Sequence, residues 1–101
     1  MLTSKQRAQL RGMAATADTV LQIGKSGITE NVIQQADEAL TARELIKGRV
    51  LDNSLLTARE ACEILAESCR AESVQAIGSK FVLYRANPEK PVIELVRDRK
   101  R

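Results

Sequence analysis

Capped helical segments and short apolar runs alternate along this chain, and few folds accommodate such an order. Thr3 and Thr57 each precede a helical pattern and are followed three residues later by Gln6 and Glu60, the spacing of a capping box that marks a helix start. Thr29 opens a third helical segment directly after a glycine-containing stretch. Because a helix that joins two strands of one sheet favours parallel pairing with a right-handed connection, the alternation predicts an α/β domain.

The apolar runs between these helices have the length of strands. The predicted strands cover residues 19–23, 45–51, 73–77 and 81–85, and Gly78-Ser79 forms a two-residue hairpin turn with glycine first. The element order is helix, strand, helix, strand, helix, strand, strand, which predicts a single two-layer domain with a four-stranded mixed sheet and packed helices. The domain is expected to span residues 1–87, and residues 88–101 form a C-terminal extension. Within the extension, residues 91–96 are a candidate edge strand and residues 97–101 a mobile basic tail.

Helical spacing predicts which side chains of the three helices face the core. The apolar positions are Leu10, Met13, Ala14 and Ala17 in the first helix, Val32, Ile33, Ala36, Ala39 and Leu40 in the second, and Ala61, Cys62, Leu65 and Cys69 in the third. Glu60, Glu63 and Glu67 form an acidic outer stripe, which is expected to face away from any nucleic-acid surface. Gly12 weakens the first helix unless a close contact requires it.

The composition excludes several classes of site. The chain has no histidine and only two aromatic residues, Phe81 and Tyr84, so it lacks the stacking platforms of single-strand binders. Cys62 and Cys69 would lie about 10 Å apart along a helix, too far for a disulfide, and a zinc site lacks ligands. No metal, cofactor or catalytic residue is predicted. The two cysteines are expected to be small core residues in a reducing cytoplasm, and no apolar run reaches membrane-spanning length.

Charge is distributed unevenly along the chain. Residues 1–30 carry four basic and two acidic side chains, residues 31–72 five and eight, and residues 73–101 seven and three. The two ends are therefore basic and the middle is acidic, which suits a polyanionic partner on one side of the molecule. Solvated charge that serves only solubility is the alternative.

The stretch from Ile23 to Thr29 carries the strongest local signal for a ligand. A strand turns on Gly24 and Gly27 into a helix start, so backbone N–H groups meet the positive end of the helix dipole beside Lys25. The glycine spacing excludes a Walker A loop and a dinucleotide fingerprint. A G-x-x-G backbone clamp for RNA and a purely structural turn both remain open, although the known KH clamp joins two helices.

Four blocks of sequence, in order, carry a family resemblance across residues 2–86. Along the chain they are residues 10–14, residues 20–29, residues 43–47, and Ile77-Gly78 leading to residues 82–85. Together they resemble the YhbY-type CRM domain (chloroplast RNA splicing and ribosome maturation). The resemblance implies an RNA-binding domain whose fold is similar to the C-terminal domain of translation initiation factor three. Gly48 departs from the branched apolar residue usual in the family, which is expected to loosen its strand.

These observations predict a non-enzymatic, monomeric RNA-binding protein of the cytoplasm. The resemblance adds ribosomal RNA, or a large-subunit precursor, as the partner and subunit maturation as the role. Phosphate contacts are expected from Lys25 and from N–H groups around Ser26 to Thr29, with Gly24 and Gly27 permitting close approach. The wider basic footprint is predicted to comprise Arg7, Arg11, Lys47, Arg49, Lys80 and Arg85. The alternative is a protein–protein adaptor in which the glycine loop, residues 24–27, is only a turn.

Overall fold

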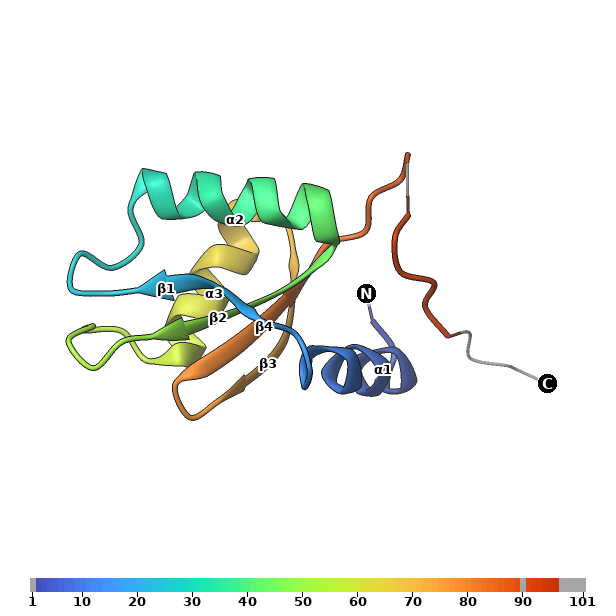
Figure 1. The fold of residues 1–101 in the computed structure, drawn as a ribbon, viewed down its shortest axis with the longest axis horizontal. Coiled ribbons are helices and arrows are strands. Elements are labelled where there is room, and N and C mark those ends of the chain that lie inside the picture. Colours follow the sequence, from blue (N-terminus) through green and yellow to red (C-terminus); the bar gives the residue numbers. More distant parts are fainter. Residues whose placement is uncertain (1, 90, 97–101) are drawn as a thin grey trace.

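A four-stranded mixed sheet forms the centre of the molecule (Figure 1). The computed structural model describes residues 2–89 and 91–96. The strands are β1 (Thr19–Ile23), β2 (Leu45–Val50), β3 (Glu72–Ile77) and β4 (Lys80–Tyr84). Their order in the sheet is β1-β2-β4-β3, with β1 parallel to β2 and β4 antiparallel to both of its neighbours. The predicted α/β class and mixed sheet are confirmed, and the β3–β4 hairpin turns at Gly78, where φ is +60°.

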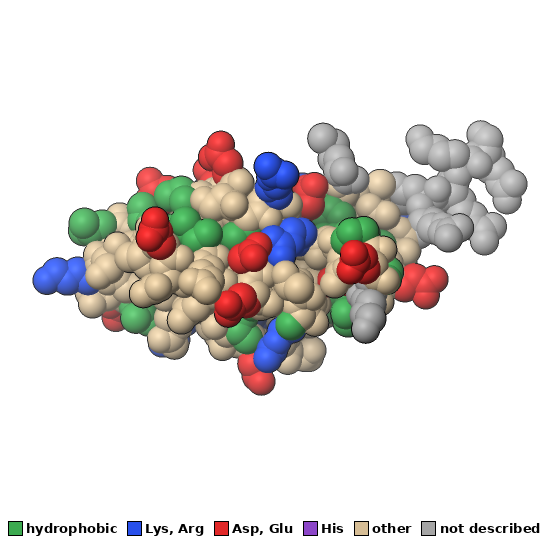
Figure 2. All heavy atoms as spheres, turned by 90° about the horizontal axis from the view of Figure 1, so that it is seen from above, with side chains coloured by type: hydrophobic (Ala, Val, Ile, Leu, Met, Phe, Trp, Pro, Cys, Tyr) green, Lys and Arg blue, Asp and Glu red, His purple; other side chains and the backbone are tan. Residues whose placement is uncertain are grey.

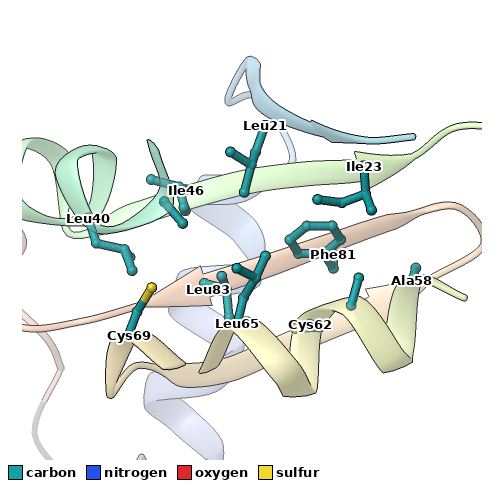
Figure 3. Packing of buried hydrophobic residues seen from close by; sticks show 12 residues of the cluster. Leu21, Ile23, Leu40, Ile46, Ala58, Cys62, Leu65, Cys69, Phe81 and Leu83 are labelled. Carbon is teal, nitrogen blue, oxygen red and sulfur yellow. The ribbon is translucent and has the colours of Figure 1, made fainter. Parts of the chain in front are cut away.

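The three helices divide between the two faces of the sheet. They are α1 (Ser4–Ala14), α2 (Glu30–Arg43) and α3 (Ala58–Cys69). Helices α2 and α3 cover one face and enclose the main core, which Figure 3 shows around Phe81, Ile46 and Leu65. Helix α1 packs on the opposite face, where a smaller cluster joins Leu10 and Ala14 to β3 and β4. Over the described residues, none of the helices has the length and apolar character needed to cross a membrane.

The predicted helix starts are confirmed in detail. The Thr3 hydroxyl oxygen accepts from the Gln6 N–H at 3.1 Å, and the Thr3 N–H donates to the Gln6 side chain at 3.0 Å. Thr57 and Glu60 repeat this reciprocal pair at the start of α3. Thr29 caps α2 by accepting from the Val32 N–H at 3.2 Å. Two capping boxes and one simple cap therefore fix where the helices begin.

The predicted core positions are confirmed for α2 and α3 and fail at the end of α1. Helix α1 ends at Ala14, and Met13 is 41% exposed. The Ala17 N–H donates to the Ala14 carbonyl in a turn that follows the helix. Both cysteines are buried free thiols, as predicted. Burial raises the pKa of the Cys62 thiol, and the nearby Ser73 hydroxyl only partly offsets this effect.

Replacing Gly12 with alanine is expected to stabilise the protein. A Cβ atom at Gly12 would have no neighbour within 4 Å, so no close contact requires glycine in this exposed part of α1. The substitution removes the backbone entropy cost of a helical glycine, about 1 kcal/mol. Thermal unfolding should show a melting temperature higher by about 4–8 °C. An unchanged or lower melting temperature would mean that the flexibility of Gly12 does not limit stability.

The prediction of an edge strand at residues 91–96 is wrong. This segment forms no strand and lies along α1, with Ile93 and Leu95 packed against the smaller cluster. Its backbone groups bond to side chains instead: the Val96 N–H donates to the Gln9 side chain at 2.7 Å, and the Gln9 amide donates to the Glu94 carbonyl at 2.8 Å. The basic tail predicted at residues 97–101 lies outside the described residues.

Candidate nucleic-acid interface

One row of exposed side chains crosses all four strands on the side of the sheet that α1 only partly covers. Arg49 on β2 is in register with Gln22 on β1 and with Lys80 on β4, and Lys80 is in register with Ile77 on β3. All four residues are exposed, and Ile77 keeps 66% of its surface accessible. We call Gln22, Arg49, Lys80 and Ile77 the exposed row. It presents two adjacent cations and an apolar side chain on an open sheet surface.

A hollow of about 320 Å³ lies between the exposed row and the C-terminal end of α1. We call it the basic hollow, and its lining residues are Arg11, Ala14, Ala15, Lys47, Gln75, Ile77, Lys80 and Val82. Lys47 Nζ donates to the Ala14 carbonyl at 3.2 Å, which places its charge at the negative end of the α1 dipole. Three predicted basic residues from α1, β2 and β4 therefore meet in one concavity.

The glycine loop forms a tight turn with its polar residues outermost. The Gly27 N–H donates to the Gly24 carbonyl at 3.0 Å, and Gly27 has a φ of +70°, in the left-handed region that favours glycine. Lys25 and Ser26 are exposed, and within the described part of the chain no partner binds the Lys25 ammonium. The Gly27 N–H is one of the groups, around Ser26 to Thr29, that were expected to bind phosphate. Because it already donates to Gly24, it is engaged within the turn.

Residues 51–56 support the glycine loop from the side. The Leu51 N–H donates to the Ile23 carbonyl at 2.8 Å, and the Asn53 side-chain oxygen lies 3.7 Å from the position of a Cβ atom built on Gly24. Asn53 and Arg49 line the same shallow depression. Residues 51–56 therefore lie between the glycine loop and the exposed row. Both loops lie at the same end of the molecule (Figure 1), from which a basic side chain projects (Figure 2).

Arg7 and Arg85 do not join this group of cations. Arg85 donates to Asp37 at 2.6 Å, to the Cys69 carbonyl at 2.9 Å and to the Thr41 hydroxyl at 2.8 Å, and so connects β4 to α2 and α3. Arg7 donates to the Ser73 carbonyl at 2.5 Å, which attaches α1 to β3. The guanidinium groups of these two residues hold elements of the fold together.

An acidic stripe lies on the other side of the sheet. Glu60, Glu63 and Glu67 are exposed on α3, whose inner side packs on the sheet face opposite the exposed row. Figure 2, which looks onto the α2 side, shows acidic side chains spread over that surface with several basic side chains among them. The acidic stripe of α3 therefore faces away from the exposed row, as expected. Across the described residues, no group of three or more His, Cys, Asp or Glu side chains could hold a metal ion.

Two polar residues with defined roles were not predicted. Glu44 is fully buried at the end of α2, and its carboxylate accepts from the N–H groups of Asn87 at 2.5 Å, Val92 at 2.9 Å and Ile93 at 2.7 Å. Burial by itself would raise the pKa of this carboxyl, but the three donors outweigh that effect and hold the pKa below its ordinary value. A glutamate next to a helical arginine gives no sequence signal for such a role.

Gln75 was missed because its position depends on a β-bulge. The register of β3 against β4 shifts between Ser73 and Gln75. Ser73 faces the main core, where its hydroxyl lies 3.2 Å from Cys62 Sγ. With Val74 as the inserted residue, Gln75 lies opposite Val82 and lines the basic hollow. Strict alternation from Ser73 would have directed Gln75 to the main core.

Comparisons with known proteins identify the family of this chain. Residues 2–85 match the CRS1/YhbY (CRM) domain. The chain is 43% identical over 95 residues to the Bacillus subtilis protein named "Probable RNA-binding protein YqeI", covering 94% of this chain and 99% of the relative. It is 34% identical over 88 residues to a protein of Haemophilus influenzae named "RNA-binding protein", covering 87% and 89% of the two chains.

A solved structure gives the same picture of the fold. The solution structure of the Staphylococcus aureus protein SAV1595, described as a candidate RNA-binding protein, superposes with a TM-score of 0.79. The two sequences are 49% identical, and the match covers 95% of this chain and 100% of the other. With a family match over most of its length and close relatives of similar size, this chain belongs to the CRS1/YhbY (CRM) domain family.

Proposed function

We propose that this protein binds RNA through a surface formed by the glycine loop, the exposed row and the basic hollow. The observation that carries the proposal is the convergence of Arg11, Lys47, Arg49 and Lys80, which come from three separate elements, on one face of the sheet. The acidic stripe of α3 lies on the other side of the sheet. Relatives that match nearly the full chain are named as RNA-binding proteins.

The chemistry of this surface suits a phosphate backbone. Lys25, Arg49 and Lys80 project as charges from an exposed loop and an open sheet, where each neutralised phosphate releases condensed counterions. With only two aromatic residues in the chain, both of them buried, base stacking cannot supply much of the affinity. Structured RNA, recognised through its backbone and shape, fits these properties better than a long unpaired strand.

The more specific role that we propose is binding of ribosomal RNA during maturation of the large ribosomal subunit. This ribosomal role comes from the YhbY-type resemblance. We also propose a monomer of the cytoplasm, where free cysteines stay reduced, and a protein that is not an enzyme, since the chain has no histidine for proton transfer. Titration of large-subunit ribosomal RNA into the purified protein at two salt concentrations tests the RNA-binding step. A steep fall in affinity with salt is expected. Salt-independent or absent binding would favour a protein–protein adaptor instead.

Replacing Lys25 with alanine should weaken binding of all RNA sequences to a similar degree. The ammonium group contacts phosphate as a point charge, so its loss should reduce the slope of log K against log salt by about one. The measurement is a salt titration of the variant beside the wild type. Lys5→Ala, which removes an equal charge from the exposed start of α1, is the matched control. An unchanged slope in Lys25→Ala would remove the loop from the interface.

Alanine substitutions at Arg49 and Arg85 are expected to have opposite effects, one on RNA binding and the other on protein stability. Arg49 is exposed and in register with Lys80, so Arg49→Ala should weaken RNA binding and change the free energy of unfolding by less than about 0.5 kcal/mol. Arg85→Ala removes the contacts to α2 and α3 and should destabilise the protein by about 1–2 kcal/mol with little change in salt slope. Denaturation and RNA titrations on both variants would check this, and the reverse pattern would contradict the proposed interface.

A further inference from the structure

We infer that the basic hollow receives a single unpaired nucleotide of the bound RNA. This inference rests on the proposed function and goes beyond it, because it assigns a pocket to one nucleotide where the surrounding surface contacts the backbone only. Three properties of the hollow carry it: its size and apolar lining, the side-chain amide of Gln75 in that lining, and the three cations that also line it.

The size and apolar lining of the hollow fit a flat, largely apolar group. At about 320 Å³, it reaches the lower end of the range for ligand pockets, roughly 300–1,000 Å³. Ala14, Val82 and Ile77 supply apolar lining from α1, β4 and β3. A base stacked inside a duplex cannot enter such a concavity, whereas a bulged or looped-out base can be turned outward and buried there.

Gln75 provides the polar group that a base edge needs. A glutamine amide offers both hydrogen-bond donors and an acceptor, and the described residues contain no hydrogen-bond partner for this side chain. The β-bulge at Val74 places Gln75 on the side of the hollow rather than in the main core. Bulges that redirect a side chain in this way are common next to functional sites.

The cations of the hollow distinguish a nucleotide from an uncharged ligand. Arg11, Lys47 and Lys80 come from α1, β2 and β4 and line the same concavity as the apolar residues. Lys47 is fixed there by its bond to the Ala14 carbonyl at 3.2 Å. An apolar surface with a hydrogen-bonding amide and several positive charges matches a base attached to its phosphates.

The inference is tested with two RNA hairpins that differ by one bulged nucleotide. The wild-type protein should bind the bulged hairpin about tenfold more tightly than the fully paired one, a gain of the size that one hydrogen bond and the burial of a small apolar area provide. Ala15→Phe fills the hollow from an exposed position without changing charge. In this variant the ratio between the affinities for the bulged and the paired hairpin should fall to about one.

A control variant and a second test variant accompany Ala15→Phe. Ala8→Phe makes the same change at an exposed position of α1 that does not line the hollow, and it should keep the preference. Gln75→Ala should reduce the preference about three- to tenfold, which tests the hollow even if Ala15→Phe does not fold.

The two proposals fail in different ways. Equal binding of the two hairpins by the wild type, with the usual dependence on salt, would overturn the nucleotide pocket and leave RNA binding intact. If Ala15→Phe and Gln75→Ala both still bind the bulged hairpin more tightly, the base lies outside the hollow. That result would also overturn the inference. Absence of salt-dependent binding to either hairpin would overturn the proposed function itself.

Discussion

Replacing Gly48 with alanine is expected to destabilise the protein by about 1–3 kcal/mol. Gly48 lies on β2 directly opposite Phe81 on β4, and the Phe81 ring covers the space that a side chain would occupy. A Cβ atom at Gly48 would lie 2.7 Å from Phe81 Cε1 and closer still to Cζ. Phe81 is completely buried in the main core, so the ring cannot move aside without displacing its neighbours.

Chemical denaturation of Gly48→Ala and Gly12→Ala would measure this effect against a matched substitution. The same added methyl group should stabilise at Gly12, where the surroundings are open, and destabilise at Gly48, where they are filled. In a double-mutant cycle, Phe81→Leu should remove most of the cost of Gly48→Ala, because the shorter side chain leaves room for the Cβ atom. Additive effects of the two substitutions would mean that the ring is not the obstacle.

Replacing Glu44 with glutamine should detach the C-terminal segment and destabilise the protein by about 1.5–3 kcal/mol, the value of a hydrogen bond to a charged group. The carboxylate accepts three backbone N–H groups, whereas an amide would direct its own NH₂ group at one or more of these donors. The cost stays limited because the released segment exposes its N–H groups to water. Hydrogen exchange of the Val92 and Ile93 amides, measured with Glu67→Gln as a surface control, would report the detachment.

This destabilisation should depend on pH with a defined sign. The pKa of the Glu44 carboxyl is lowered in the folded protein, so its contribution is complete above the ordinary glutamate pKa of about 4.3 and is lost as the pH falls through the lower folded value. The stability difference between wild type and Glu44→Gln should therefore be largest near neutral pH and narrow in acid. A difference that stays constant from pH 7 to pH 2 would show that the charge contributes nothing.

Sequence periodicity predicted the elements well where the determinants are local. The capping residues Thr3, Thr29 and Thr57 identify helix starts because each cap bonds within its own first turn. Cys62 and Cys69 were assigned to the core from helical spacing, and both are buried. These signals depend on neighbours three or four residues away, which the sequence displays directly.

The remaining features depend on contacts between distant residues. Gly48 was expected to loosen β2, but the space it leaves is filled by Phe81, 33 positions further along the chain. Pro91–Val96 is rich in the branched apolar residues that favour a strand, yet Glu44 and Gln9 accept the N–H groups that a strand would donate. No local pattern reveals which partner such a segment will find.

The basic residues illustrate the same limit within the candidate site. Lys47 and Lys80 meet because β4 inserts between β2 and β3, an order that periodicity does not determine. Arg85 was placed in the wider footprint on charge alone, and its guanidinium binds Asp37 and the end of α3. Sequence therefore predicted that a basic surface exists, while topology decides which cations compose it.

The attachment of α1 through its own small cluster has a consequence for motion. Leu10 and Ala14 contact Val74, Val82 and Tyr84 in a group that shares no residue with the larger core beneath α2 and α3. Elements held by few buried contacts open locally at a lower free-energy cost than the whole molecule. Because Ala14 and Ala15 form one wall of the basic hollow, each opening of α1 would remove that wall while the four strands stay paired. The rate at which a ligand enters or leaves the basic hollow would then be set by how often α1 opens.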